Sequence, residues 1–399
     1  MPHTHLPVVP VAPILNLDAR PPLETHPVPS VLDAGDVRLL TAGRLGECHA
    51  LRLLGIGPGD RVLLPAYHCI SMLYPIQWLG AEPVFYRLHP DTSIDFEDMA
   101  AHLAAGAKAV IATHFFGFAQ DIGRVRALCD AHGAALIEDC AHAFFGQWQG
   151  RPLGSFGDYA IASPVKFFPV FDGGCLISAR HSLEAVRPRT GDAAFQIKAV
   201  LDPLERATLY GRLSLLGSLL WLKNTLWTAL KRRRGRTDGA AAPVIGPSSS
   251  GGGAELALEW LETGMSRAAR LGMQRGRRTS ARIAQARRAN YRRLAAALSG
   301  LPGCRPLRPE LPDETVPYVL PLLVDDPAQV FPALKQARVP VLRWEDMPEA
   351  ALTACPVANR YRSALLQLPC HQALRSHEID WIAAQVRAAV AAAGTGVPA

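Results

Sequence analysis

Short, nearly continuous apolar runs alternate with segments of helical spacing along the first half of the chain. The apolar runs cover residues 61–65, 81–86, 109–113 and 134–137. A segment of helical spacing, from Asp121 to His132, precedes the last of these runs. Strands that are apolar on both faces and alternate with helices are typical of a parallel sheet covered by helices on both sides. The pattern therefore predicts an α/β fold.

Beyond this region the pattern changes. From Pro302 onward it predicts a small α+β domain, with strands over 316–324 and 339–342 and helices over 327–336 and 376–390. The Arg-rich segment 265–299 predicts one long helix. The expected divisions are an irregular Pro- and His-rich arm over 1–36, a large domain over 37–180, a hydrophobic and basic insertion with a Ser/Gly-rich linker over 181–264, and the long helix with the small domain over 265–399. We expect the arm to lie on the body of the protein or on a partner subunit.

The composition narrows the class of protein. The chain has 399 residues, 49% of them hydrophobic, which is enough for a large core in about two or three domains. Its eight cysteines show neither CxxC pairs nor metal spacing, so we expect reduced thiols, no metal site and a cytoplasmic location. The net charge of +7 suits an anionic partner such as a nucleotide-sugar diphosphate or a membrane surface. No nucleic-acid motif accompanies that charge. The N-terminal residues lack an early basic region followed by a long apolar core, so we expect no signal peptide.

Residues 134–178 carry the candidate chemistry. The apolar run at residues 134–137 predicts a buried strand, and Asp139 follows at its carboxyl end, where α/β enzymes bind ligands. Lys166 lies between two predicted buried strands, and burial lowers the pKa of a lysine and makes its amine nucleophilic. A buried lysine with a carboxylate on a neighbouring strand favours pyridoxal phosphate (PLP), because the carboxylate keeps the pyridine nitrogen protonated. The hydroxyl of Ser163 could bind the cofactor phosphate. The structural alternative is that Lys166 reaches solvent and Asp139 caps the next helix.

This stretch resembles the DegT/StrS-type sugar aminotransferases, which are PLP enzymes of fold type I. IEDCAHAFFG, which contains His142, resembles their EDxAxAxG strand end, and GSFGDYAIAS resembles their GSFGDxxxFS segment. Lys166 followed by Asp172-Gly173-Gly174 resembles their cofactor lysine and its glycine turn. The resemblance covers roughly residues 41–180 and returns more weakly toward the C-terminus.

The resemblance implies a role for each of several residues. Lys166 would hold PLP and move protons, Asp139 would face the pyridine nitrogen, and His142 would contact the cofactor. The family places a Gly-Thr pair at the helix N-terminus that meets the phosphate, where this chain has Gly43-Arg44. LLPAYHC resembles the family's VPSFTF segment, so Tyr67 or His68 is the expected ring over the cofactor.

The resemblance also implies the reaction. An amino acid, with glutamate as the expected donor, would give its amino group to a keto sugar, carried on a nucleotide, in amino-sugar or polysaccharide biosynthesis. Enzymes of this fold complete each site with a second subunit, which implies a homodimer. A related dehydratase branch replaces the lysine with histidine, so Lys166 argues against it. A catalytically silent scaffold or membrane-associated subunit in polysaccharide assembly remains the alternative.

Residues 204–236 combine many leucines and tryptophans with a basic run at Lys231–Arg236. Arg212 and Lys223 are eleven residues apart, which places them on the same side of a helix. This pattern is typical of a helix that lies in a membrane surface, and it raises the hypothesis of peripheral contact with the inner membrane. The alternative is a helical hairpin packed on the large domain or across a dimer.

Overall fold

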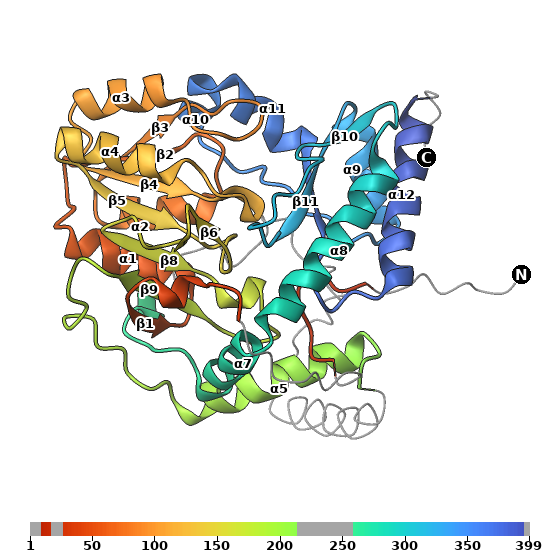
Figure 1. Cartoon of the computed structure of the whole chain (residues 1–399), viewed down its shortest axis with the longest axis horizontal. Coiled ribbons are helices and arrows are strands. Elements are labelled where there is room, and N and C mark those ends of the chain that lie inside the picture. The colour runs from red at the N-terminus through yellow and green to blue at the C-terminus, as the bar shows by residue number, and fades with distance from the viewer. Residues whose placement is uncertain (1–8, 17–26, 214–257, 395–399) are drawn as a thin grey trace, which may run out of the picture.

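The computed structural model describes residues 9–16, 27–213 and 258–394. A seven-stranded sheet forms the centre of the larger domain, and a smaller domain lies beside it (Figure 1). The order across the sheet is β1-β9-β8-β5-β4-β2-β3. The strands are β1 (Asp36–Leu40), β2 (Arg61–Pro65), β3 (Glu82–Tyr86), β4 (Ala109–Thr113), β5 (Ala135–Asp139), β8 (Tyr159–Ala162) and β9 (Gly174–Ser178).

Strands β2, β3, β4, β5 and β8 are parallel, and β9 is antiparallel to both β8 and β1. The direction reverses at β9 because only a short connection, which contains the 3-10 turn η4 (Pro164–Lys166), joins it to β8. A parallel pair would need a crossover of a dozen residues or more. The prediction of an α/β fold with a mostly parallel sheet is confirmed.

Helices flank the sheet, and α3, α4 and α5 begin at aspartates whose side chains accept a hydrogen bond from an N–H group of the first turn. Asp95 accepts a hydrogen bond from Asp98 N at the start of α3, and Asp121 accepts one from Arg124 N at the start of α4. The large-domain helices are α1 (Gly43–Leu53), α2 (Leu73–Trp78), α3 (Phe96–Ala104), α4 (Ile122–His132) and α5 (Ala193–Leu209). The shorter elements are η1 (Val31–Asp33), η2 (Ile70–Met72), η3 (Phe115–Gly117), η5 (Leu258–Trp260) and the hairpin strands β6 (Gln147–Trp148) and β7 (Arg151–Pro152).

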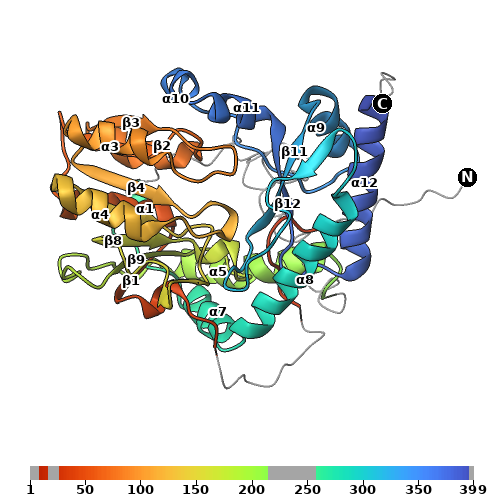
Figure 2. The ribbon, with the colours of Figure 1, turned by 45° about the horizontal axis from the view of Figure 1, so that its top comes forward.

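The smaller domain is an antiparallel three-stranded sheet with helices packed on it (Figure 2). Its strands are β10 (Cys304–Pro306), β11 (Val319–Val324) and β12 (Leu365–Pro369). Its helices are α9 (Pro327–Gln336), α10 (Glu349–Ala354), α11 (Pro356–Ala364) and α12 (Ser376–Gly394), and α12 contacts α9. Helices α7 (Arg267–Arg277) and α8 (Ser280–Leu298) lead from the large domain to this sheet.

Two predicted elements differ from the structure. The single helix predicted over 265–299 is wrong, because Thr279 leaves helical geometry (φ −119°, ψ 25°) between α7 and α8. The strand predicted over 339–342 is also wrong, and only an isolated bridge joins Leu342 to Gln367. Arg338 has a left-handed backbone (φ 61°), and Pro340 has no N–H to donate to a ladder, so regular pairing fails there.

The two domains meet where η3 contacts the start of β11. Tyr318 N donates to Phe116 O at 2.8 Å, across this junction. Gly117 has a φ of +101°, and a Cβ placed on it would lie 2.5 Å from Val316 O. The close approach of the two backbones therefore requires glycine at this position.

The described part of the N-terminal arm packs on the body of the protein. Val9 and Ile14 are buried, and His371 Nε2 is 3.0 Å from Pro10 O. Further along, Val28 N donates to Ser280 Oγ at 2.8 Å. These contacts hold the described residues 9–16 and Val28 against the body of the protein.

Helix α5 ends at Leu209, and the chain then turns inward at Arg212. The Arg212 guanidinium is buried and binds the Glu378 carboxylate of α12 at 2.6 Å. The prediction that Arg212 lies on the polar side of a membrane-surface helix is therefore wrong, because its charge is neutralised inside the protein. The rest of that prediction, residues 214–236, lies outside the described residues. Over the described ranges, no helix has the length and apolar character needed to cross a membrane.

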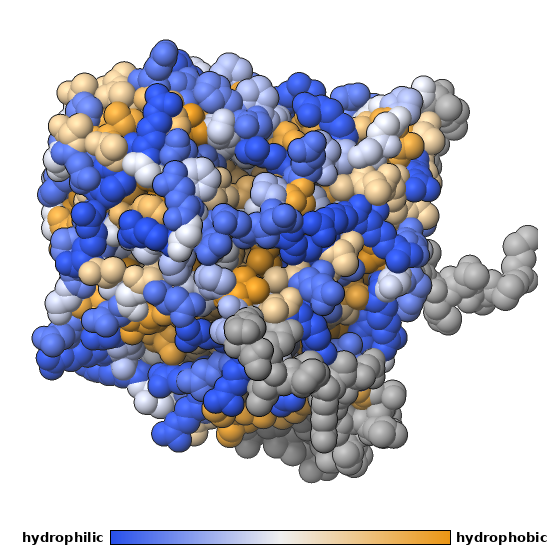
Figure 3. All heavy atoms as spheres, in the orientation of Figure 1, coloured by the Kyte–Doolittle hydropathy of each residue, from blue (hydrophilic) through white to orange (hydrophobic). Residues whose placement is uncertain are grey.

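The face of the molecule in Figure 3 is mostly hydrophilic, with hydrophobic residues in small separate groups. Large apolar side chains that are well exposed include Ile197 and Val200 on α5 and Leu271 on α7. Because α5 and α7 are in contact, these side chains belong to neighbouring helices.

Candidate functional site

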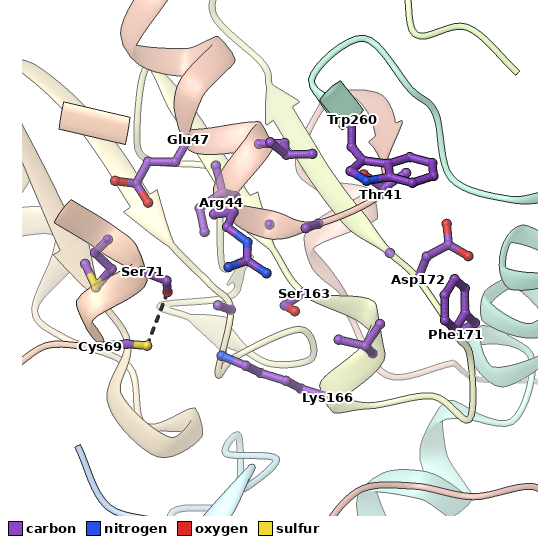
Figure 4. Close-up of a pocket in the computed structure, with 18 of the residues that line it drawn as sticks. Thr41, Arg44, Glu47, Cys69, Ser71, Ser163, Lys166, Phe171, Asp172 and Trp260 are labelled. Atoms are coloured by element: carbon purple, nitrogen blue, oxygen red, sulfur yellow. Dashed lines mark hydrogen bonds between the residues drawn. The ribbon is translucent and has the colours of Figure 1, made fainter. Parts of the chain in front are cut away.

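A cavity of about 850 Å³ opens at the carboxyl ends of β5 and β8, beside the N-terminus of α1 (Figure 4). The carboxyl edge of a parallel sheet is where α/β folds bind ligands. Six of the residues singled out in the sequence line this cavity: Lys166, Asp139, Ser163, Gly43, Arg44 and His142. The fold thus brings together side chains that are up to 123 positions apart, from Gly43 to Lys166.

Lys166 stands at the end of η4 and points its amine into the cavity (Figure 4). Pro164 begins this turn, and Lys166 N donates to Ser163 O at 3.1 Å. The amine lies 5.4 Å from the centre of the Tyr318 ring. Enclosure by the cavity lowers the pKa of Lys166, while nearby Asp139 acts in the opposite direction. A larger share of Lys166 is therefore the neutral, nucleophilic amine at neutral pH than for a lysine in water.

Asp139 ends β5 and is 5% exposed. Its Oδ1 accepts a hydrogen bond from Ala141 N at 2.8 Å, and its Oδ2 accepts one from Thr113 Oγ1 at 3.3 Å. Burial raises the pKa of Asp139, and the charge of Lys166 is the largest influence that opposes this rise. A fixed carboxylate and a nearby amine of perturbed pKa are typical of a reacting centre.

The N-terminus of α1 faces the same cavity. Ala42 precedes the helix and supplies no capping side chain, so the first N–H groups of α1 are available to an anion. The buried Thr41 Oγ1 has no hydrogen-bond partner among the residues described. A Cβ on Gly43 would lie 3.1 Å from Ala162 O, so the backbone approaches β8 closely here. The Arg44 guanidinium extends toward the cavity, which adds positive charge to this end (Figure 4).

His142 forms another wall of the cavity. Its ring stacks on Tyr318 with centroids 4.4 Å apart and an interplanar angle of 29°. Phe116 N donates to His142 Nδ1 at 3.4 Å. Burial, with the nearby charge of Lys166 as a second cause, holds the pKa of His142 well below its usual range. The ring is therefore neutral at physiological pH.

Tyr67 and His68, the predicted stacking rings, do not line the cavity. Tyr67 is fully buried and packs against Trp344 with centroids 5.0 Å apart. His68 stacks on Phe85 at 5.3 Å, and its Nδ1 lies 3.0 Å from Pro65 O. The Tyr67 ring thus packs against the small domain, and the His68 ring packs against β3. Small side chains from the next residues, including Cys69 and Ser71, line the cavity instead.

Glu47 is a cavity residue that the sequence reasoning missed. It lies one turn into α1, is 3% exposed, and its Oε1 has no hydrogen-bond partner in the part of the chain that is described. Burial raises the pKa of Glu47 well above its usual range, and the charge of Asp139 adds to the rise. The environment of Glu47 therefore favours its uncharged form, beside the second carboxyl group of Asp139. The one signal in the sequence is an acidic residue inside the otherwise apolar helical run LGECHAL.

The outer part of the cavity has an aromatic wall that was also missed. Trp260 of η5 lies 5.0 Å from Phe195 of α5, and Phe171 lies 6.0 Å from Phe195, both measured between ring centroids. The amine of Lys198 is 5.0 Å from the centre of the Phe171 ring. Phe195, Lys198 and Trp260 come from the segment after β9, whereas Phe171 belongs to the connection that precedes β9. Trp344, from the small domain, lines another part of the cavity. The arrangement suits a flat or ring-shaped ligand that carries negative charge.

Glu138, which precedes Asp139, points to the other side of β5 and has a structural role. It accepts hydrogen bonds from the backbone N–H groups of Gly154, Phe156 and Gly157 and contacts His114 Nε2 at 3.2 Å. Together with Cys140 these side chains form a compact buried cluster. Because the carboxylate oxygens are already used by these donors, the cluster holds the GSFG segment against β5 and offers no free ligand set to a metal ion.

The fold of this chain is similar to that of solved aminotransferases. The aminotransferase TlmJ from Streptoalloteichus hindustanus has a similar structure, with a TM-score of 0.62 and 23% identity over 90% of this chain and 86% of that chain. The aminotransferase from Psychrobacter cryohalolentis is also similar, with a TM-score of 0.63 and 18% identity over 90% of this chain and 88% of that chain. These likenesses confirm the predicted fold class.

Residues 40–186 match the model of the DegT/DnrJ/EryC1/StrS aminotransferase family, which confirms the family resemblance over those residues. Over 145 residues the chain is 37% identical to the UDP-N-acetyl-3-dehydro-alpha-D-glucosamine 3-aminotransferase of Acidithiobacillus ferrooxidans. The matched stretch is 34% of this chain and 38% of that protein. Over 132 residues it is 38% identical to the GDP-perosamine synthase of Vibrio cholerae, which covers 32% of this chain and 36% of that protein. The chain thus spans little more than a third of the length of these curated relatives.

Proposed function

We propose that this protein is a PLP-dependent aminotransferase that moves an amino group from an amino acid, with glutamate as donor, to a keto sugar carried on a nucleotide. The observation that carries the proposal is the convergence of Lys166, Asp139 and the N-terminus of α1 on one cavity. DegT-family aminotransferases are PLP-dependent, and a lysine, a carboxylate and an anion site are the three contacts that PLP needs. The buried Thr41 Oγ1, without a partner among the described residues, supports an anion at this helix end.

The residues of the cavity divide the work between binding and proton transfer. When bound, PLP supplies an electron sink for the carbon that loses or gains the amino group. Gly43, Arg44 and Ser163 bind the phosphate, since the helix N-terminus and a guanidinium both favour a dianion. Asp139 keeps the proton on the pyridine nitrogen, held in place by Thr113 Oγ1 and Ala141 N.

Lys166 would hold the cofactor, and its amine would move a proton to and from the reacting carbon of the donor or acceptor. Its lowered pKa makes the neutral amine available as that base. His142 takes the cofactor contact that was predicted for Tyr67 or His68, because its ring lines the cavity and theirs do not. The Tyr318 ring supports His142 from the opposite side.

The acceptor enters past the aromatic wall formed by Phe171, Phe195 and Trp260. A nucleotide base stacks on such a wall, and Lys198 and Arg44 attract the diphosphate. The names of two relatives, which specify UDP- and GDP-linked sugars, support this class of acceptor. We also propose a cytoplasmic homodimer, whose subunit contact would cover exposed apolar side chains such as Ile197 on α5 and Leu271 on α7.

The test begins with the purified full-length protein and added PLP. We expect a visible absorbance band that borohydride removes, and a covalent adduct on Lys166 by mass spectrometry. Lys166→Ala abolishes the adduct and the conversion of glutamate to 2-oxoglutarate, whereas Lys335→Ala, a lysine of α9 outside the cavity, retains both. Transamination that survives Lys166→Ala would refute the proposal. A protein that forms no adduct at all would favour the silent scaffold.

A further inference from the structure

Arg287 of α8 is a fully buried cation whose contacts are with neutral groups. Its guanidinium donates to Lys166 O at 2.8 Å and to Pro317 O at 3.0 Å, and its Nε donates to Gln372 Oε1 at 2.8 Å. Among the described residues no carboxylate pairs with it. Burial lowers the pKa of Arg287 to about 10, so the group stays charged at neutral pH. A buried charge without a counterion is costly, which indicates a positional requirement beyond filling the core.

The guanidinium and Gln372 together hold the two peptide groups that follow the amine-bearing residue. Arg287 binds the carbonyl of Lys166, and Gln372 Nε2 binds the carbonyl of Phe167 at 2.7 Å. The guanidinium carbon also lies 4.5 Å from the centre of the Phe167 ring. Three contacts therefore act on adjacent residues in a short connection that has no strand or α-helix ladder to fix it.

The same guanidinium also holds the residues that pack behind His142, a lining residue of the cavity. It reaches Tyr318 O at 3.3 Å as well as Pro317 O, at the start of β11. The Tyr318 ring stacks on His142 and faces the Lys166 amine. One side chain thus links the lysine, the small-domain sheet and the loop after β12, which are otherwise separate in sequence.

We propose that Arg287 and Gln372 form a clamp that positions the amine of Lys166, so that the seating of the small domain sets the reactivity of this lysine. Arg287 is a positioning residue in this scheme, since it touches the backbone of Lys166 and not the reacting atoms. The identity of Lys166 as the cofactor lysine rests on the proposed function, but the clamp can be tested without a cofactor.

Arg288, the next residue on α8, provides a matched control. Its guanidinium donates to the carbonyls of Pro312, Asp313 and Thr315 and binds the Asp313 carboxylate. It therefore ties the same helix to the small domain with as many hydrogen bonds. None of its contacts within the described ranges involves the connection between β8 and β9.

The experiment compares full-length variants Arg287→Met, Arg287→Lys, Gln372→Leu and Arg288→Met, freed of any bound PLP and checked for folding by circular dichroism. Acetic anhydride labelling over a pH series, read by mass spectrometry, gives the midpoint at which Lys166 becomes reactive, with Lys108 as the internal reference. Loss of the clamp lets the Lys166 amine reach water, and hydration of its charged form raises that midpoint. We expect a rise of at least about 0.5 pH unit, roughly a threefold change in neutral amine at fixed pH, in all three clamp variants.

Arg288→Met leaves the Lys166 midpoint unchanged if the clamp acts locally. Equal midpoints in the Arg287→Met and Arg288→Met proteins would overturn the inference. The inference would also be overturned if the Lys166 midpoint rose in Arg287→Met but stayed normal in Arg287→Lys. The positive charge at position 287, without the hydrogen bonds of the guanidinium, would then explain the rise. If Arg287→Met does not fold, the Arg287→Lys and Gln372→Leu proteins decide the question. Failure of the proposed function would appear separately, as absence of a PLP adduct on Lys166 in the unaltered protein.

Discussion

The buried ion pair between Arg212 and Glu378 allows a quantitative test of how the chain is held after α5. The two side chains are 1% and 5% exposed, and Arg212 Nη2 lies 2.7 and 2.6 Å from the two carboxylate oxygens. Glu378 also accepts a hydrogen bond from Arg375 N and lies in the first turn of α12, where negative charge is favourable. The pair therefore joins the segment beyond α5 to the small domain.

Arg212→Met keeps the bulk of the side chain and leaves the Glu378 carboxylate buried without its cation. Removing one partner of a buried pair costs about 3–5 kcal/mol in the free energy of unfolding. At about 3 kcal/mol per molar urea, this corresponds to a midpoint lower by about 1 M or more. The double variant Arg212→Met with Glu378→Leu removes both charges, and its stability should return to within about 1 kcal/mol of the unaltered protein.

The assay is urea unfolding followed by both fluorescence and circular dichroism. Arg206→Met is the matched control, because Arg206 forms an exposed ion pair with Asp202 on α5 at 2.8 Å and should cost only about 0.2–1 kcal/mol. An Arg212→Met protein as stable as the Arg206→Met protein would show that Arg212 is solvated. The reasoning that places residues 204–213 against the body of the protein would then fail.

Two predictions concern the cavity. Asp139→Asn keeps the shape of the side chain but removes its charge, so we expect PLP to bind while turnover falls by at least about 100-fold. A loss of turnover below about tenfold, which is about 1.4 kcal/mol of activation barrier, would show that Asp139 does not keep the pyridine nitrogen protonated. Trp260→Ala and Lys198→Met should each raise the KM for the nucleotide-linked acceptor about tenfold and leave the single-turnover reaction with glutamate unchanged. Arg206→Met, on the same helix as Lys198 but outside the cavity, should change neither quantity. An unaltered acceptor KM in both variants would remove the aromatic wall from the acceptor site.

The parts of the fold that follow from local patterns were predictable. The strands ending at Pro65, Thr113 and Asp139 are continuous apolar runs, and the Asp121–Gly133 helix carries its cap and its stop in the sequence. The break at Thr279 was not predictable in the same way. Its hydroxyl donates to Gly276 O, a contact that no hydrophobic period marks.

The residues that line the cavity were predictable where one segment carries several of them in order, as in Asp139, Ser163 and Lys166. It was not predictable where distant segments meet. Tyr67 could be placed near the cofactor by its position after β2, but only the packed small domain shows that Trp344 holds its ring outside the cavity. Trp260 and Phe195 approach each other from segments with no shared motif, so nothing local marks them as one wall.

The contact between Phe116 N and His142 Nδ1 also determines where the imidazole keeps its proton. Since Nδ1 accepts a hydrogen bond and the ring is neutral, the proton resides on Nε2, and the ring is a single fixed tautomer. In that tautomer Nε2 can donate a hydrogen bond but cannot accept one. A ligand atom that contacts Nε2 must therefore be a hydrogen-bond acceptor. Because its pKa is held well below the usual range, His142 adds no inflection of its own to the dependence of the reaction rate on pH near neutrality.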